Sequence, residues 1–296
     1  MTQTTQIVCI GSILWDIIGR SSKKLTRSDD IEGHIEKLPG GVTMNLATRL
    51  RSHGIIPSIL SALGDDSAGK ELIKVCEQAG IICKSIIIKP GSKTDYYMAI
   101  EDKTGVALAV ADTTLLKSAK DAVLDPLLVG DYKDWKGPIA VDSNLSPAVL
   151  KILRHNERFK VSDFRLAPAS PSKVTRLKIF LDHPGANIYL NLKEANLISE
   201  MQFDTSKEAA TTLLSNGLKT ILITDGPNAA CLASKSEIIE LQPPRVKVKR
   251  LTGAGDVLMA SHIAKVLKGE DNFVAFKYAI EQTSKFISED PTNETN

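Results

Sequence analysis

The chain has 296 residues and a formal net charge of +2, because 37 Lys and Arg residues nearly balance 35 Asp and Glu residues. This balance argues against a dedicated nucleic-acid binder, which needs a strong basic excess to hold phosphates. No apolar run of about 18 residues is present to span a bilayer. Polar residues 1–6, followed by an apolar run broken at Asp16, do not form a secretory leader. We therefore expect a cytoplasmic protein with no membrane partner.

The four cysteines, Cys9, Cys76, Cys83 and Cys231, show no zinc-binding pattern. No two of them form a C-x-x-C pair, and no histidine lies near them at zinc-finger spacing. We expect them to be reduced and to pack mostly as small hydrophobic residues.

Apolar, β-rich runs alternate with amphipathic helical patterns along the whole chain. Strands are predicted at 7–13, 58–63, 81–89, 96–101, 105–111, 139–142, 161–166, 187–192, 220–224, 229–235 and 237–241. Helices are predicted at 42–53, 69–79, 147–155, 172–182, 194–199, 206–216, 255–268 and 273–288. Strands separated by helices require crossover connections, which favour a mostly parallel sheet with helices on both faces. We predict an α/β fold that forms one domain over residues 1–296.

Two segments, at about 12–40 and 92–112, do not follow this alternation. Residues 96–101 and 105–111 are separated by a short polar turn, which is typical of a hairpin. We expect the two segments to form a small antiparallel sheet that projects as a lid over the ligand-binding edge.

The strongest functional pattern is Thr252-Gly253-Ala254-Gly255-Asp256, directly before an apolar helical run. Glycines at a helix start expose backbone N–H groups, and the positive end of the helix dipole attracts phosphate. The alternative is an ordinary helix start, in which Asp256 is stabilised by the dipole and the glycines form a simple turn. A second matching segment favours the phosphate-binding interpretation.

That second segment is Gly40-Gly41-Val42-Thr43-Met44-Asn45. The double glycine allows the backbone to approach a ligand, and the Asn45 amide can donate to and accept from hydroxyls. Upstream, Asp16 is predicted to end an apolar strand. A carboxylate at the carboxyl end of a parallel strand lies where α/β proteins bind their ligands.

Together and in this order, these segments resemble the ribokinase-like (PfkB) family of carbohydrate and nucleoside kinases over essentially the whole chain. Asn191 and Glu194 match the family's Asn-x-x-Glu element, and Thr224 and Gly226 stand at its nucleotide loop. Residues 141–146, 168–173 and 109–112 are further similar to segments of pseudouridine kinases. Four positions depart from the pattern of the relatives: Leu14, Ala167, Asp225 and Arg250.

The resemblance implies ATP-dependent phosphorylation of a primary hydroxyl, the 5′-hydroxyl of pseudouridine. Asp256 would accept the hydroxyl proton, and the backbone N–H groups of Gly253, Ala254 and Gly255 would stabilise the charge on the transferred phosphoryl group. The implied contacts to the substrate come from Asp16, Gly40, Gly41, Asn45, Asp112 and Thr114, the last two at the base.

The resemblance also implies a nucleotide side formed by Asn191, Thr224, Gly226, Thr252, Gly253 and Gly255. Mg²⁺ would be held mainly by phosphates and water, with Glu194 acting through water. Several relatives use a monovalent cation such as K⁺, and Arg250 would alter that site. Relatives also form homodimers through the lid.

Two alternatives remain open on the sequence. Leu14, where the family often has Asn, favours another nucleoside or a sugar as the substrate. The departures at Ala167, Asp225 and Arg250 favour a catalytically silent member that binds a nucleoside.

Overall fold

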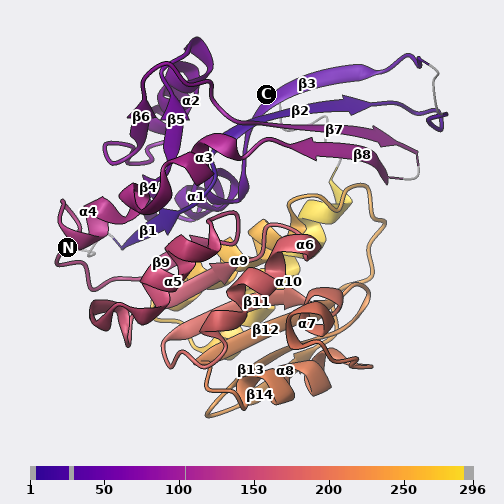
Figure 1. The fold of residues 1–296 in the computed structure, drawn as a ribbon. Coiled ribbons are helices and arrows are strands. Elements are labelled where there is room, and N and C mark those ends of the chain that lie inside the picture. Colours follow the sequence, from indigo (N-terminus) through magenta and orange to yellow (C-terminus); the bar gives the residue numbers. More distant parts are fainter. Residues whose placement is uncertain (1–4, 27–29, 104, 290–296) are drawn as a thin grey trace.

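The computed structural model describes residues 5–26, 30–103 and 105–289. Its main feature is an eight-stranded sheet in the order β14-β13-β12-β11-β10-β9-β1-β4 (Figure 1). The strands are β1 (Gln6–Ile10), β4 (Ile56–Leu60), β9 (Ile139–Asp142), β10 (Phe164–Ala167), β11 (Ala186–Asn191), β12 (Thr220–Asp225), β13 (Asn228–Ser234) and β14 (Ile238–Leu241). From β4 to β12 all neighbouring pairs are parallel, and β13 and β14 add an antiparallel edge. The predicted mostly parallel α/β sheet is confirmed.

A second sheet of four strands, called here the small sheet, projects from this body in the order β3-β2-β7-β8. Its strands are β2 (Leu14–Arg20), β3 (His34–Gly40), β7 (Tyr96–Asp102) and β8 (Gly105–Ala111). They lie within the two segments that the sequence sets apart. The pairing differs from the expected antiparallel one at β2 and β7, which run parallel, because the long crossover through the body joins them.

The structure corrects the first predicted strand, 7–13. β1 ends at Ile10, and the chain starts again as β2 at Leu14. The break falls at Gly11, where an added Cβ would lie 2.2 Å from the Cβ of Asp142, so the chain passes against the end of β9. Asp16 therefore lies within the small sheet and not at the end of a strand of the large one.

Two other predicted elements are shorter than expected. Of the predicted strand 81–89, only β6 (Ile87–Lys89) forms, paired with β5 (Ala62–Gly64). The predicted helix 172–182 divides into α6 (Pro171–Val174) and a 3₁₀ turn, η3 (Thr175–Phe180). Tertiary pairing decided both cases, since the local patterns are compatible with longer elements.

Helices cover both faces of the large sheet, because its buried strand residues alternate between two cores. In β1, Ile7 and Cys9 face one core, while Val8 and Ile10 face the other. The first face packs against α1 (Val42–Ser52), α9 (Ala254–Leu267) and α10 (Asn272–Ser288). The second packs against α5 (Pro147–His155), α7 (Leu192–Ser199) and α8 (Ser206–Leu214).

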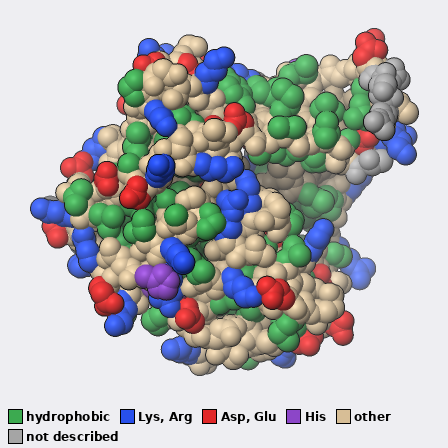
Figure 2. Space-filling model, in the orientation of Figure 1, with side chains coloured by type: hydrophobic (Ala, Val, Ile, Leu, Met, Phe, Trp, Pro, Cys, Tyr) green, Lys and Arg blue, Asp and Glu red, His purple; other side chains and the backbone are tan. Residues whose placement is uncertain are grey.

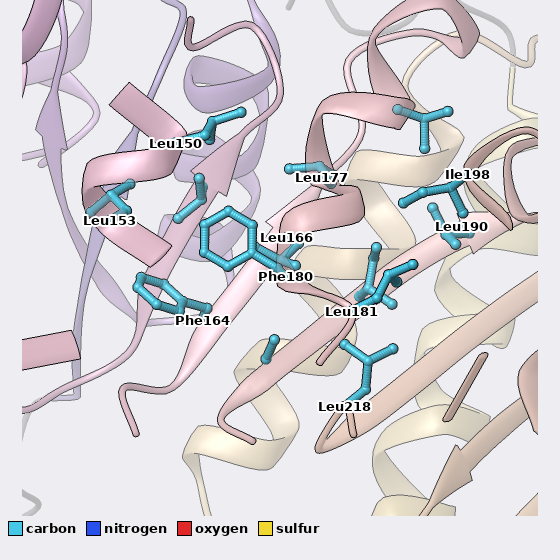
Figure 3. Close-up of a cluster of buried hydrophobic side chains, with 14 of the residues drawn as sticks. Leu150, Leu153, Phe164, Leu166, Leu177, Phe180, Leu181, Leu190, Ile198 and Leu218 are labelled. Atoms are coloured by element: carbon cyan, nitrogen blue, oxygen red, sulfur yellow. The ribbon is translucent and has the colours of Figure 1, made fainter. Parts of the chain in front are cut away.

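Figure 3 shows part of this second core, where Phe164 of β10 and Phe180 of η3 point toward each other. Their ring centroids are 5.3 Å apart in an edge-on arrangement. Such packing fixes the strands, and therefore the loops at their carboxyl ends. The remaining helical elements are α2 (Ser67–Gln78), α3 (Thr114–Ser118), η1 (Lys120–Leu124), α4 (Asp125–Leu128) and η2 (Glu157–Phe159). In the described ranges, no helix is long and apolar enough to cross a membrane.

Candidate active site

A cavity of about 750 Å³ lies between the small sheet and the carboxyl ends of the large sheet's parallel strands. Figure 2 shows the surface hollowed beneath the small sheet. The cavity brings together these predicted residues: Asp16, Gly41, Asn45, Asn191, Glu194, Thr224, Gly226, Thr252, Gly253, Ala254, Gly255 and Asp256. Segments from both ends of the chain therefore meet in one place.

Helix α9 begins at the cavity, after a residue in the left-handed backbone conformation that favours glycine. Gly253 is the N-cap, with φ of 85°, and no side chain caps this helix start. An added Cβ at Gly255 would meet nothing within 4 Å. Residues 257–264 are all buried, and the apolar ones among them pack the helix against the large sheet and so hold its start in place. The Ala254 N–H donates to the Leu251 carbonyl oxygen at 3.1 Å, so the N–H groups of Gly253 and Gly255 are the ones that can bind an anion at this terminus.

Asp256, in the first turn of α9, points toward α1. Its Oδ2 accepts a hydrogen bond from Asn45 Nδ2 at 3.1 Å. Burial raises the pKa of Asp256 to about 7, with the charges of Asp142 and Asp16 adding to the effect, while Asn45 and Arg49 oppose it. A carboxylate with this pKa exchanges a proton near neutral pH, which suits a general base.

Asp16 faces the same cavity from β2. Burial raises its pKa also to about 7. An added Cβ at Gly40 would lie 2.1 Å from Asp16 Cγ, so glycine is needed for this carboxylate to pack over β3. Gly40 itself does not line the cavity and acts through Asp16. Gly41, with φ of 90°, does line it, and an added Cβ there would approach the Ser12 carbonyl oxygen to 2.6 Å.

Asn191 and Glu194 form a capping box at the start of α7. Asn191 Oδ1 accepts from the Glu194 backbone N–H, and Glu194 Oε2 accepts from the Asn191 backbone N–H, both at 2.9 Å. Burial raises the pKa of Glu194, whose side chain lines the cavity. The box positions one carboxylate beside the nucleotide side that the sequence predicts.

The chain matches the pfkB family carbohydrate kinase family over residues 4–288. It belongs to this family. It is a phosphotransferase whose acceptor is a hydroxyl of a sugar or nucleoside.

Among curated relatives, the pseudouridine kinase of Escherichia coli is 28% identical over 267 residues, covering 88% of this chain and 83% of that protein. The pseudouridine kinase of Arabidopsis thaliana is 23% identical, covering 96% and 90% of the two chains. Among solved structures, a putative sugar kinase from Clostridium perfringens aligns with a TM-score of 0.81 at 22% identity, over 99% of this chain and 92% of that one. Ribokinase from Arabidopsis thaliana, complexed with ribose and ATP, aligns with a TM-score of 0.76 at 17% identity, over 97% and 94%.

In this kinase, Asp112 and Thr114 lie beside the cavity without lining it. Both side chains are exposed, and Asp112 Oδ1 accepts from the Thr114 backbone N–H at 3.0 Å. The residues between and before them, Thr113 and Ala111, do line the cavity. The structure therefore does not bring the two predicted base contacts to the site, because Asp112 folds back onto the start of α3.

A polar network that sequence reasoning did not assign to the site forms part of the cavity wall. Ser12 Oγ donates to Asp142 Oδ2 at 2.6 Å, and Asn144 Nδ2 donates to Ser12 Oγ at 2.9 Å. Lys173 Nζ donates to Asn144 Oδ1. Burial lowers the pKa of Lys173, while the charge of Asp142 opposes that shift. Ser12, Asn144 and Lys173 line the cavity, and the segments 141–146 and 168–173 were the sequence signal for Asn144 and Lys173.

The four departures have definite positions in the kinase. Leu14 and Ala167 line the cavity with apolar side chains. Asp225 Oδ2 accepts from Asn228 Nδ2 at 2.9 Å within the β12–β13 turn. The Arg250 guanidinium stacks 3.6 Å from the ring centroid of Phe286, and its Nε donates to the Phe286 carbonyl oxygen. Arg250 therefore fastens the loop before α9 to α10.

Proposed function

We propose that this kinase transfers the γ-phosphoryl group of ATP to the 5′-hydroxyl of pseudouridine. The observation that carries the phosphoryl transfer is Asp256, hydrogen-bonded to Asn45, at the open start of α9. The choice of nucleoside is supported by likeness to the curated pseudouridine kinases of Escherichia coli and Arabidopsis thaliana, which spans most of each chain.

In the proposed reaction, Asp256 orients the substrate hydroxyl and accepts its proton as the oxygen attacks. The new bond joins the 5′-oxygen to the γ-phosphorus, while the bond from that phosphorus to the bridging oxygen of ADP breaks. Backbone N–H groups at Gly253 and Gly255 stabilise the charge on the phosphoryl oxygens, and the Ala254 N–H joins them once it leaves the Leu251 carbonyl oxygen. Because burial raises the pKa of Asp256 to about 7, this base can gain and lose a proton near neutral pH.

The sugar hydroxyls are proposed to bind at the other side of Asp256. Asp16 offers a carboxylate, Asn45 an amide, and Gly41 its backbone, all lining the same cavity. The network of Ser12, Asn144 and Lys173 adds polar groups on the same cavity wall. We further propose that the small sheet acts as the lid that excludes water during transfer.

The residues present fit ATP with Mg²⁺ held through phosphates and water. Thr224, Gly226 and Thr252 line the nucleotide side, and Glu194 supplies one carboxylate there. The described residues contain no group of three His, Cys, Asp or Glu side chains that would hold a metal unaided. Mg²⁺ bound to ATP would neutralise phosphate charge. K⁺ is not part of the proposal, because the fixed positive charge of Arg250 already lies at the loop before α9.

A homodimer through the small sheet is proposed from its exposed apolar side chains. Every residue of β8 is exposed, and Leu108 and Val110 keep 58% and 64% of their surface exposed. Met98, on the neighbouring β7, is 53% exposed. Figure 2 shows hydrophobic side chains gathered on this sheet. A contiguous apolar surface of this kind favours self-association.

A substrate panel tests the proposed reaction. The purified kinase is supplied with ATP and Mg²⁺ and, separately, with pseudouridine, uridine, adenosine and ribose, and the phosphorylated position is identified by NMR. We expect kcat/KM for pseudouridine to exceed that of the others by about tenfold or more. Turnover of ribose or adenosine with pseudouridine inert would replace the substrate and leave the family intact.

A second candidate, a kinase of another nucleoside or of a sugar, is favoured by one observation. Leu14 lines the cavity with an apolar side chain where relatives often have Asn. The panel decides between the two, since a lost hydroxyl contact would appear as a raised KM for pseudouridine. Equal consumption of ATP by the wild type and Asp256→Asn would instead favour a silent nucleoside-binding protein.

A further inference from the structure

A second cavity, of about 280 Å³, lies at the amino edge of the large sheet, opposite the active site. The strands enter the sheet here: Arg165 lies near the start of β10, Asn187 near the start of β11, and Thr220 begins β12. Helix α9 contributes His262, further along the same helix that begins with Asp256. No aspartate or glutamate is among the residues that line this second cavity.

The protonation of His262 follows from its neighbours. The Tyr189 hydroxyl accepts from Arg165 Nη1 at 3.3 Å and lies 2.9 Å from His262 Nδ1. Arginine can only donate, so among the described residues His262 Nδ1 is the acceptor that the Tyr189 hydroxyl proton can reach, and we assign Nδ1 as that acceptor. Burial lowers the pKa of His262 to about 3, so the ring is neutral and its proton lies on Nε2.

That Nε2–H is an uncompensated donor. His262 is 1% exposed, and its Nε2 is buried without a hydrogen-bond partner among the described residues. An unpaired buried donor costs about 1–3 kcal/mol, so such groups usually meet an acceptor. His262 lines the second cavity, and the group that would satisfy it there is a hydrogen-bond acceptor.

The rest of the cavity adds positive charge. Lys219 and Lys235 are exposed at its rim, and the part of the chain that the structure describes provides no ion-pair partner for either. Arg165 is buried, and Asp163 pairs with it at 2.8 Å, so those two charges offset each other. Two further acids adjoin the lining: Glu237, whose carboxylate accepts from Asn272, and Asp271, whose carboxylate accepts from the Val274 N–H at the start of α10. The second cavity is therefore lined by the ammonium groups of Lys219 and Lys235 and by the neutral donor His262 Nε2–H, all of which bind hydrogen-bond acceptors.

We propose that this second cavity binds a small oxyanion, a phosphate or a phosphate monoester. Lys219 and Lys235 supply the charge, and His262 Nε2–H supplies a hydrogen bond. The volume is close to the lower limit of small-molecule sites and leaves room for a sugar phosphate. The proposal does not depend on the substrate of the active site.

The test must separate this site from the active site, which also binds phosphate groups. Inorganic phosphate and ribose 5-phosphate are titrated by calorimetry into the wild type, into Lys219→Ala/Lys235→Ala, and into Lys133→Ala/Lys136→Ala. The last pair removes the same charge at exposed positions that line neither cavity. All four lysines are exposed, so we expect each variant to fold.

We expect Lys219→Ala/Lys235→Ala to weaken binding of at least one probe by about tenfold, with the control pair within about twofold of the wild type. Tighter binding of ribose 5-phosphate than of phosphate assigns the site to a phosphate monoester, and equal binding assigns it to phosphate itself. Equal affinities in all three proteins, or no binding of either probe, would overturn the proposal.

Discussion

The large sheet and the small sheet each contribute one carboxylate to the same cavity, and their surroundings differ. Asp256 begins a helix that is buried against the large sheet, and Asn45 of α1 holds it. Asp16 lies on a sheet whose outer strand β8 is exposed along its whole length, and the absence of a side chain at Gly40 sets its position. Burial raises both pKa values to about 7.

Two carboxylates on structurally different parts of the molecule thus reach a similarly raised pKa: Asp256 on a helix packed in the body, and Asp16 on the projecting small sheet. The body holds Asp256 rigidly, which suits the atom that must face the reacting hydroxyl. The small sheet is anchored only at its base, which suits a group that meets the substrate as the cavity closes. We expect substitutions on the two sides to separate turnover from binding.

The largest effect is expected from Asp256→Asn, which keeps the shape and removes the proton acceptor. We expect kcat to fall by about 10²–10⁴, with KM for the nucleoside within a few-fold of the wild type. Steady-state kinetics with the best substrate of the panel measures both. A kcat near the wild-type value would show that Asp256 is not the base.

Gly40→Ala is expected to affect substrate binding through Asp16 on the small sheet. The new Cβ would overlap the Asp16 carboxylate and displace it, so we expect kcat/KM to fall by about tenfold or more, mainly through KM. The matched control is Gly19→Ala on the same sheet, where an added Cβ meets only the Ala99 carbonyl oxygen at 4.0 Å. Similar losses in both variants would mean that the small sheet is generally intolerant of alanine.

The dependence of kcat/KM on pH follows from the two raised pKa values. Both carboxylates must be ionised to act, so we expect kcat/KM to rise up to about pH 7 and then level off. Below pH 7, kcat/KM falls by about tenfold per pH unit if one ionised carboxylate is required. It falls more steeply if both Asp16 and Asp256 must be ionised. A profile with a single acidic limb in Asp16→Asn would assign the second limb to Asp16.

Disrupting the proposed homodimer contact on the small sheet is expected to change the oligomeric state more than the kcat. Val110→Lys places a charge on the exposed apolar surface of β8, and we expect it to convert a dimer into a monomer in light scattering. Val161→Lys, at a position 78% exposed outside the small sheet, is the control. A wild-type protein that is already monomeric at micromolar concentration would contradict the proposed homodimer.

The smallest expected effect is on stability. The folded pKa of Asp256, about 7, lies above the unfolded value of about 3.9, so the folded state binds the proton more tightly. Its contribution to the free energy of unfolding is therefore lost as pH rises from about 4 to about 7. Asp256→Asn removes this loss, and we expect Tm to rise by roughly 5–10 °C at pH 8 and to change little near pH 4. Calorimetry at both pH values measures it.

Much of the site could be predicted because its residues lie in a few short segments of the sequence. Gly253, Gly255 and Asp256 stand together at a helix start, and Gly41 with Asn45 starts another helix, so local patterns are sufficient to find them. The apolar runs likewise predicted a parallel sheet, since strands buried on both faces need continuous hydrophobic residues. The resemblance to the ribokinase-like family then placed these segments in one site.

Contacts between segments that lie far apart in the sequence were decided only by the tertiary structure. The hydrogen bond from Asn45 to Asp256, the passage of the chain at Gly11 against Asp142, and the Lys173 network each join distant segments. The sequence by itself indicated most of the helices and strands and the glycine-rich helix starts, because those depend mainly on neighbours along the chain, while pairing across the sheets set the limits of the elements at 7–13, 81–89 and 172–182. Only packing determined the raised pKa of Asp256 and the unpaired donor of His262, because burial depends on what the rest of the chain places around them.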